Sequence, residues 1–470
     1  MKTNTILLQI RMFKLFRLMT LLLATLCVST LRAEDWPQWF GPQRDGIYRE
    51  KGILESFPKD GLTVKWRAPI FGGYAGPAVA NGKVFVMDFH LKEEVKRPTN
   101  AFKRITQPGV ERVICLNEKT GEVIWKHAYD CDYSMSYSSG PRTTPTVEGD
   151  RVYCFGGEGD LMCLDIETGK PIWQKKLSGE QSPTPMWGFS SHPMIYNDKV
   201  ICLVGGAGSE YGKGVVRAFD KTTGRDSWSA LTAKEPGYSA PILIEQAGVK
   251  QLIIFTTNSI SSLDPERGTV YWTQPYGPAR VGVSIVTPRF YRDAVLGDLL
   301  LVCTQYEGTM VIKLDQDKPT ASVLWKRVGK SERKSEALHT LMSSPVMRDQ
   351  HVYGICVFGE LRCLDLRNGD RLWETTDATT YDAGQQKWAS AFLIPIGETG
   401  NRFYIFNEHG DLILADLSPK KYEEISKAHL IEPTNTDPGR PVVWTVPAFA
   451  NRAIFVRNDK EIICFDNAAK

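Results

Sequence analysis

The sequence predicts an all-β protein, an eight-bladed β-propeller built from four-stranded antiparallel blades, and three observations support this fold class. A turn motif recurs at a period of about 50 residues, which is typical of solenoids, propellers and arrays. Each period holds four short runs rich in β-branched and aromatic residues, separated by Gly, Asp and Asn turns, as in an antiparallel blade. The one segment after the N-terminal region that suggests a helix is a short turn near Tyr422–Ala428.

The recurring motif consists of a small residue or Cys, an apolar residue and then Asp or Asn. Glycine often follows four residues later and tryptophan eight residues later. The acidic or amide position is occupied by Asn117, Asp165, Asp220, Asp264, Asp315, Asp365, Asp416 and Asp466. The glycines are Gly121, Gly169, Gly224, Gly268 and Gly369, and the tryptophans in exact register are Trp125, Trp173, Trp228, Trp272 and Trp373.

These repeated residues are interpreted as scaffold. An Asp at a strand end accepts hydrogen bonds from backbone N–H groups two residues on, while Gly adopts the positive φ that the turn requires. A Trp on an outer strand fills the widening wedge between two blades. Functional residues do not normally recur in register in every repeat, so the functional site is sought elsewhere.

The count of eight blades depends on how the ring closes. The last unit ends at Asp466, four residues before the C-terminus, and lacks a fourth strand. The run Leu62–Arg67, which includes Trp66, has the pattern of the missing outer strand. A ring closed by its own two ends leaves no open sheet edge inside the ring. We therefore assign residues 62–470 to the propeller and residues 34–61 to an N-terminal extension.

Residues 1–33 have the composition of a cleaved signal peptide. Basic residues precede an apolar run from Leu18 to Val28, and a polar stretch ends at Ala33. The apolar run is too short to span a bilayer, so we expect no transmembrane helix after cleavage. Cys27 follows Leu26, a poor context for lipidation, which favours a protein released to the periplasm or cell envelope over a lipoprotein.

The charge of the chain without its leader argues against a nucleic-acid partner. The leader contains five basic and no acidic residues, so its removal changes Lys plus Arg from 57 to 52, against 54 acidic residues. A near-neutral surface lacks the basic footprint of nucleic-acid binding. We expect a monomer.

Nine cysteines remain after the leader, and two pairs raise the question of disulfides. Cys154 with Cys163, and Cys356 with Cys363, are spaced so that each pair can face across a hairpin. In an oxidising compartment each pair is a disulfide candidate, and a buried free thiol is the alternative. No cysteine spacing matches a zinc site.

The segment from Cys163 to Trp173 resembles the tryptophan-docking motif of the PQQ-type (pyrroloquinoline-quinone repeat) β-propeller superfamily. The stretches 35–46 and 140–147 are similar to segments of exported PQQ-like propellers of planctomycete-type bacteria. The resemblance covers about residues 62–470. It implies a propeller fold and either an assembly scaffold or a quinoprotein, since one fold hosts many functions.

Candidate site residues come from the segments that lead into the innermost strand of each blade, because these segments ring one mouth of a propeller's channel. Departures from the repeat pattern here combine aromatic rings with cationic or imidazole groups. An aromatic mouth with one arginine suits a flat, anionic or polyhydroxylated ligand, with the guanidinium binding a carboxylate through paired hydrogen bonds. Closure of the channel by packing is the structural alternative. The candidates are Arg142, Trp187, His192, Tyr238, His339, Trp388 and Trp444.

Two insertions interrupt the repeat. One, near Phe89–Arg112 in unit one, can cap the mouth, contact a partner or remain a solvated loop. The other, Gly205–Gly214 in unit three, is similar to a phosphate-binding loop only in its glycine content, since no Gly-Lys-Ser/Thr follows.

Two functions compete. The first is a non-catalytic binding or assembly scaffold of the cell envelope, whose partner is an envelope protein or a small polar or glycan ligand. The alternative is a PQQ-dependent dehydrogenase that oxidises an alcohol or sugar, with PQQ and Ca²⁺ as cofactors. The resemblance implies that such enzymes hold PQQ against a Trp, opposite a disulfide of adjacent cysteines. This chain has no adjacent cysteine pair and no haem-attachment Cys-x-x-Cys-His, which favours the scaffold, and we assign no catalytic or metal-binding residue.

Overall fold

The computed structural model describes residues 34–179, 183–205, 214–233, 235–277 and 283–469. The predicted leader and most of the glycine-rich insertion of unit three lie outside this part. Contacts divide the chain into Met1–Glu34 and Asp35–Lys470, and the architecture given below belongs to the second unit. Among the described residues, no helix has the length and apolar character needed to cross a membrane.

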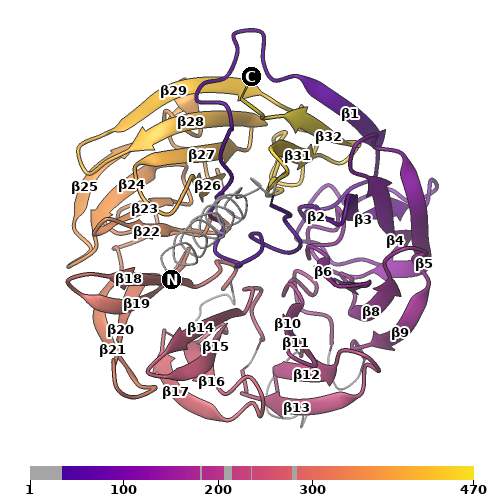
Figure 1. Cartoon of the computed structure of the whole chain (residues 1–470), viewed down its shortest axis with the longest axis horizontal. Coiled ribbons are helices and arrows are strands. Elements are labelled where there is room, and N and C mark those ends of the chain that lie inside the picture. Colours follow the sequence, from indigo (N-terminus) through magenta and orange to yellow (C-terminus); the bar gives the residue numbers. More distant parts are fainter. Residues whose placement is uncertain (1–33, 180–182, 206–213, 234, 278–282, 470) are drawn as a thin grey trace, which may run out of the picture. The chain divides into compact units, whose positions relative to one another are not determined.

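Eight four-stranded antiparallel sheets are arranged in a ring around a central axis (Figure 1). Blades one to four are β2 (Ala78–Ala80), β3 (Lys83–Leu91), β4 (Gln107–Asn117) and β5 (Val123–Tyr133); β6 (Thr146–Glu148), β7 (Arg151–Phe155), β8 (Asp160–Asp165) and β9 (Pro171–Lys176); β10 (Met194–Tyr196), β11 (Lys199–Leu203), β12 (Val216–Asp220) and β13 (Asp226–Ala230); β14 (Ile242–Gln246), β15 (Val249–Phe255), β16 (Ser259–Leu263) and β17 (Val270–Pro275).

The other four blades follow the same order from the channel outward. They are β18 (Arg289–Asp293), β19 (Gly297–Thr304), β20 (Gly308–Leu314) and β21 (Ala321–Arg327); β22 (Val346–Arg348), β23 (His351–Ile355), β24 (Leu361–Asp365) and β25 (Arg371–Thr375); β26 (Ala391–Pro395), β27 (Arg402–Asn407), β28 (Asp411–Leu417) and β29 (Tyr422–His429); β30 (Ala448–Ala450), β31 (Ala453–Arg457), β32 (Glu461–Asp466) and β1 (Val64–Pro69). One short 3-10 helix, Tyr381–Ala383, precedes β26.

The eighth blade confirms the predicted closure of the ring. Strand β1, from the N-terminal part of the propeller, pairs antiparallel with β32, the last strand of the chain. The expected helical turn near Tyr422–Ala428 is wrong, because this segment is β29, the outer strand of blade seven. Its register against β28 is complete from Leu417↔Tyr422 to Asp411↔His429 apart from one bulge. Pairing with an existing sheet therefore determines the conformation of this short, highly charged segment.

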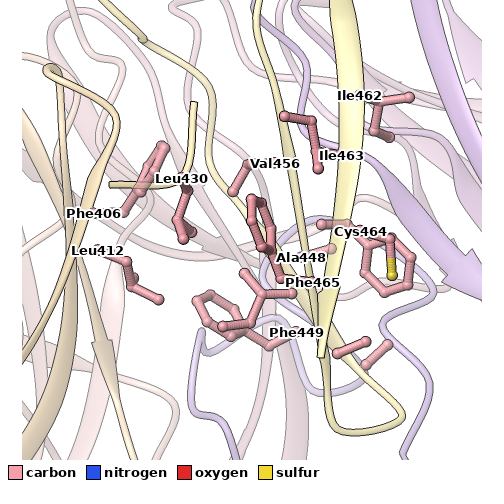
Figure 2. Packing of buried hydrophobic residues seen from close by; sticks show 14 of the residues in the cluster. Phe406, Leu412, Leu430, Ala448, Phe449, Val456, Ile462, Ile463, Cys464 and Phe465 are labelled. Atoms are coloured by element: carbon pink, nitrogen blue, oxygen red, sulfur yellow. The ribbon is translucent and has the colours of Figure 1, made fainter. Parts of the chain in front are cut away.

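The hydrophobic core lies between blades rather than within them. Among the described residues, seven of the eight clusters of buried side chains draw residues from neighbouring blades: one joins blades one and two, and another joins blades two and three. The smallest cluster, around Phe89 and Tyr133, belongs to blade one and the segment that follows β5. The largest cluster joins blades seven, eight and one, and it also includes Trp36, Phe40 and Tyr48 of the extension. Figure 2 shows its part around Phe406 and Phe449. No blade can bury its apolar faces alone, as in other repeat architectures.

The repeated tryptophans lie against the next blade. The Trp125 indole donates a hydrogen bond to the Ile166 carbonyl oxygen at 2.9 Å, and the Trp173 indole to that of Lys221 at 2.9 Å. The same contact is made by Trp66, Trp228, Trp325 and Trp373. A Cβ placed on Gly169 would meet the Trp125 ring at 2.4 Å, so the turn glycine makes room for the indole.

Trp272 is an exception. Its indole donates to Gln251 Oε1 within its own blade, at 3.2 Å. The next unit has Pro319 at the position that is glycine in five of the units. Glycine is not required for the contact, because the Trp373 indole donates to the Ser418 carbonyl oxygen in a turn that has Lys420 at this position.

The two cysteine pairs are not disulfides, and all nine described cysteines are buried free thiols. Strand pairing places Cys163 opposite Tyr153, and Cys154 opposite Met162. Because adjacent strand residues point to opposite faces, Cys154 packs in the cluster between blades one and two, and Cys163 in the cluster between blades two and three. Cys356 and Cys363 are divided between two clusters in the same way.

The extension closes the end of the channel that lies opposite the lead-in segments. Trp36 forms a bridge with Val79 on β2, and Tyr48 forms a bridge beyond β26, at Ile396. Between them, the Arg44 guanidinium enters the channel and donates to the carbonyl oxygens of His192, Pro193 and Pro241. The segment thus crosses the ring from blade one to blade seven, where the indigo trace runs through the centre of Figure 1.

One carboxyl group is buried between blades one and two. Glu111 on β4 accepts hydrogen bonds from the Tyr129 hydroxyl at 2.9 Å and the Tyr133 hydroxyl at 2.7 Å. Burial raises the pKa of Glu111 to about 7, the two tyrosine hydroxyls oppose this rise, and the nearby Asp160 adds to it. The side chain therefore changes charge near neutral pH.

Two turn glycines allow a matched test of the packing between the tryptophan ring and the turn of the next blade. Gly169 and Gly149 both have positive φ, at 68° and 60°, but no atom lies within 4 Å of a Cβ on Gly149. We expect Gly149→Ala to cost about 1 kcal/mol from the backbone alone, and Gly169→Ala to cost about 2–4 kcal/mol because it also displaces Trp125. Urea denaturation measures both, and equal costs would show that the indole contact does not matter.

The buried Glu111 predicts a pH dependence of stability. Its folded pKa is raised above the unfolded value, so the carboxyl is protonated in both states below about pH 4, and must be ionised at a cost in the folded protein above about pH 7. Relative to Glu111→Gln, we expect the wild type to lose on the order of 2 kcal/mol as pH rises from 5 to 8. A difference in unfolding free energy that does not vary with pH would contradict this assignment.

Candidate functional site

A pocket of about 340 Å³ opens at the channel mouth, and the segments that lead into the inner strands of all eight blades contribute to it. Tyr74 comes from blade one, and Trp388 and Trp444 come from blades seven and eight. The described lining residues are Trp39, Tyr74, Phe102, Tyr137, Arg142, Met186, Trp187, Ser190, His192, Tyr238, Val283, Ile285, Gln305, Tyr306, Leu341, Met342, Trp388, Phe392, Trp444 and Val446. The wall is thus mostly aromatic and aliphatic, which is the usual character of a small-molecule site.

Six of the seven residues that the sequence singled out meet in this pocket: Arg142, Trp187, His192, Tyr238, Trp388 and Trp444. His339 does not belong to it. Its ring is buried, with Nε2 accepting from the Gly329 N–H at 3.0 Å and Nδ1 2.8 Å from the Gln305 carbonyl oxygen. These two bonds hold the loop between blades five and six, so His339 has a structural position behind the wall.

Arg142 lines the pocket, but its two terminal guanidinium nitrogens already have hydrogen-bond acceptors in the protein. Nη1 donates to the Gly140 carbonyl oxygen at 2.8 Å and contacts Met135 Sδ, while Nη2 donates to the carbonyl oxygens of Ser136 and Tyr137. The guanidinium carbon lies 5.0 Å from the centre of the Tyr74 ring. The expected pair of hydrogen bonds to a ligand carboxylate is therefore not available from Nη1 and Nη2, and the residue acts in the wall as a fixed positive charge.

His192 lies at the floor beside the extension. The Trp39 ring stacks on it with centroids 3.9 Å apart, and the Trp39 indole donates to Thr287 Oγ1 at 3.0 Å. Nδ1 of His192 accepts from the Thr144 N–H at 2.9 Å. Burial, together with the charge of Arg44, holds the pKa of His192 well below its usual range. The imidazole is therefore neutral, and Trp39 seals the pocket below it.

The insertion in unit one covers part of the mouth. Phe102 lines the pocket and approaches Trp388 of blade seven at 5.8 Å between ring centroids. The segment is fixed to blade two by the Tyr137 N–H, which donates to the Ala101 carbonyl oxygen at 2.7 Å. Arg104 adds a bond to the Ser134 carbonyl oxygen at 2.7 Å. The contacts of Phe102 therefore favour a cap over the mouth as the role of this insertion, rather than a partner contact or a solvated loop.

The carboxylates around the mouth hold the wall from behind. Glu408, in the turn after β27, is buried and accepts from both Arg440 Nη2 at 2.8 Å and the Trp444 indole at 3.3 Å. Arg440 in turn donates to the Lys387 carbonyl oxygen next to Trp388. Glu158 likewise accepts from the Ser134 N–H at 2.6 Å and from the Thr184 hydroxyl. These acids fix the lead-in segments, and none of them is among the described lining residues.

Several wall residues escaped the sequence reasoning. Trp39, Phe102, Tyr137 and Tyr306 line the pocket, but none stands at a fixed distance before an inner strand. Tyr137 and Trp388 share a rarer feature, a positive φ of 53° and 62°. For bulky residues this conformation costs on the order of 1 kcal/mol or more, and such strain persists only where surrounding contacts hold it, as at ligand-binding sites. The chain also adopts it at turns away from the pocket, such as Asn81 and Asn197.

The donor set of the pocket does not fit a calcium-dependent quinone. Ca²⁺ takes six to eight oxygen ligands, including carboxylates, and the described lining residues include no Asp or Glu. Nor do the described residues contain a cluster of three His, Cys, Asp or Glu side chains suited to a metal ion. We therefore derive no reaction step through PQQ or a metal.

The fold and pocket define a class, the eight-bladed propeller with an aromatic central site. The profile of the family described as outer membrane protein assembly factor BamB, a PQQ-type repeat family, matches residues 109–375. This match spans more than half of the chain, and the protein belongs to this family. No curated protein matches the chain in sequence.

Solved structures agree with this fold. BamB from Moraxella catarrhalis is 15% identical, with a TM-score of 0.53 over 85% of this chain and 96% of that chain. The quinohemoprotein alcohol dehydrogenase from Comamonas testosteroni is 14% identical, with a TM-score of 0.60 over 93% and 81%. A europium-containing methanol dehydrogenase is 11% identical, with a TM-score of 0.62 over 92% and 89%. At such identities the likeness extends to the fold alone.

Glu408 is expected to position the two mouth tryptophans. Glu408→Ala leaves Arg440 without its partner and the Trp444 indole without its acceptor, so we expect a loss of about 3 kcal/mol in stability and a red shift of tryptophan emission. The control is Glu423→Ala on the same blade, where the ion pair with Lys421 is exposed and worth less than about 1 kcal/mol. If the two variants have the same free energy of unfolding and the same emission spectrum, Glu408 does not have this positioning role.

Proposed function

We propose that this protein is a non-catalytic binding or assembly propeller of the cell envelope, and that its partner or ligand engages the mouth pocket. The observation that carries the proposal is the composition of the wall: sixteen of its twenty described residues are aromatic or aliphatic. A buried apolar site with a few polar groups is the kind of surface that gives binding energy by excluding water.

The titratable groups of the pocket are poorly suited to catalysis. General acid–base chemistry needs a group whose pKa lies near the working pH. The pKa of His192 lies well below that range, and burial raises the pKa of Tyr238 far above it. Arg142 is committed to backbone carbonyl oxygens. These properties favour recognition over turnover.

Backbone strain at the wall supports the same proposal. Tyr137 and Trp388 lie in different blades, both adopt positive φ, and both point their rings at the pocket. The Trp388 N–H donates to the Val357 carbonyl oxygen at 2.6 Å, which helps to hold this conformation. Strain of this kind persists only where surrounding contacts fix it, and here the result is a preformed aromatic wall.

The alternative, a PQQ-dependent dehydrogenase acting on an alcohol or sugar, draws on the fold shared with quinohemoprotein and methanol dehydrogenases. It requires ligands for Ca²⁺ that the described lining residues do not supply. Export is part of the proposal as well, and the leader is then removed after Ala33.

Site-specific photocrosslinking in the producing cell tests the binding role. We expect a benzophenone amino acid at Phe102 or Tyr306 to yield a covalent adduct, detected as a mass increase on the chain or as a cross-linked partner. The control position is Val295, which is 72% exposed in the β18–β19 turn and remote from the mouth. Adducts at Val295 but at neither mouth position would overturn the proposal.

Calorimetric titration with PQQ and Ca²⁺ tests the alternative. We expect no binding at high micromolar PQQ, because the wall lacks carboxylates and offers one positively charged group. Stoichiometric binding that Trp388→Ala abolishes would instead establish a quinoprotein, and dye-linked oxidation of alcohols and sugars on the same sample would then measure turnover.

A further inference from the structure

The charge of the mouth wall is unbalanced. Arg142 is part of the lining, and none of the ion pairs among the described residues includes it. Its acceptors are neutral carbonyl oxygens and a thioether sulfur. A cation whose hydrogen bonds go to neutral groups keeps its full charge, and this charge acts across a pocket of low polarity, where electrostatic interactions are strong.

The nearest carboxylates stand behind the wall. Asp437 accepts hydrogen bonds from the hydroxyls of Tyr74 and of Ser139, the second at 2.9 Å. Glu235 accepts from the Tyr238 hydroxyl at 3.1 Å. In both places a tyrosine ring lies between the acid and the pocket, and the acid is occupied by hydroxyl donors. The group with net charge that faces a ligand directly is therefore Arg142.

The shape of the wall favours a flat ligand. Trp187 and Tyr238 meet edge to face at 5.5 Å, and Tyr137 lies 6.3 Å from Trp444. Such walls offer ring faces to an aromatic ligand. The volume of about 340 Å³ lies at the lower end of small-molecule sites. The indole N–H groups of Trp187 and Trp388 make no hydrogen bond within the part of the chain described here.

We propose that the mouth pocket binds a flat, apolar molecule of one or two fused aromatic rings that carries a single negative charge. This inference rests on the proposed function and names the ligand class of its site. The rings stack between the tryptophans and tyrosines, and the anionic group lies on the side of Arg142. The aliphatic part of the wall, which includes Leu341 and Met342, disfavours a polyhydroxylated ligand because sugar hydroxyls there would lose their hydrogen bonds.

Three naphthalene compounds of similar size separate charge from shape: 2-naphthoate, 2-naphthylmethanol and (2-naphthylmethyl)trimethylammonium. Titration calorimetry on the wild-type protein measures their affinities. We expect naphthoate to bind at least about fivefold tighter than the alcohol, and the ammonium compound to bind most weakly, with the difference shrinking as salt rises. Equal affinities, or tightest binding of the ammonium compound through cation–π contacts, would overturn the ligand class.

Substitutions show which side chain gives the preference for the anionic compound. Arg142→Gln is expected to bring naphthoate and the alcohol to within about twofold of one another, and Trp187→Ala to weaken both. Arg267→Gln removes an exposed charge on an outer turn and is expected to leave the preference unchanged. If Arg142→Gln does not fold, the salt series on the wild type still decides. Crosslinks at Phe102 or Tyr306 without binding of any naphthalene compound would refute this inference and leave the proposed function standing. If neither crosslinks nor binding of a naphthalene compound is observed, both this inference and the proposed function are refuted.

Discussion

Packing between neighbouring blades is the constraint on which the rest of the structure depends. A twisted four-stranded sheet buries little by itself, and the seven largest hydrophobic clusters of the described residues each form between blades. At the periphery of the ring, the tryptophan of each outer strand packs against the turn glycine of the next blade in most units. This contact determines the distance between neighbouring sheets. Closure through β1 extends this packing to the last blade, so that no sheet in the ring lacks a neighbour.

The same constraint creates the pocket. Because all inner strands run in one direction along the channel, the segments that lead into them meet at one mouth. The extension fills the opposite end through Trp36, Arg44 and Tyr48, and Trp39 becomes the floor of what remains. Carboxylates such as Glu408 then fix the wall from behind, and this arrangement leaves their charges out of the pocket.

The sequence predicted the blades well because the signals were local and repeated. Each inner strand after a proline begins at the next residue, as at Pro77 and Ala78, and the Asp–Gly–Trp turns fall at the same place in most blades. The segment 422–429 was misread because its charged residues resemble a surface helix, while pairing with β28 makes it a strand. For the cysteine pairs the sequence left both a disulfide and a buried free thiol open, and the structure shows free thiols, because a one-residue offset in register places the two side chains on opposite faces of the sheet.

The pocket was predictable only in part. Trp187, Trp388 and Trp444 stand out as departures from the repeat, whereas Trp39 and Phe102 reach the mouth from segments outside the blades. No local pattern reveals that the Arg142 guanidinium donates to backbone carbonyl oxygens, or that the His339 ring contacts the Gln305 carbonyl oxygen and does not line the pocket. Such properties depend on contacts between segments far apart in the chain.

We propose that the aromatic mouth is where this protein makes its functional contact. Native mass spectrometry of the protein isolated from its own cells, beside Trp187→Ala and the remote variant Arg267→Gln, tests it most directly. We expect a non-covalent mass increment on the wild type and on Arg267→Gln that is lost from Trp187→Ala. An increment that survives equally in all three proteins would place the contact elsewhere on the propeller and refute a binding role for the mouth.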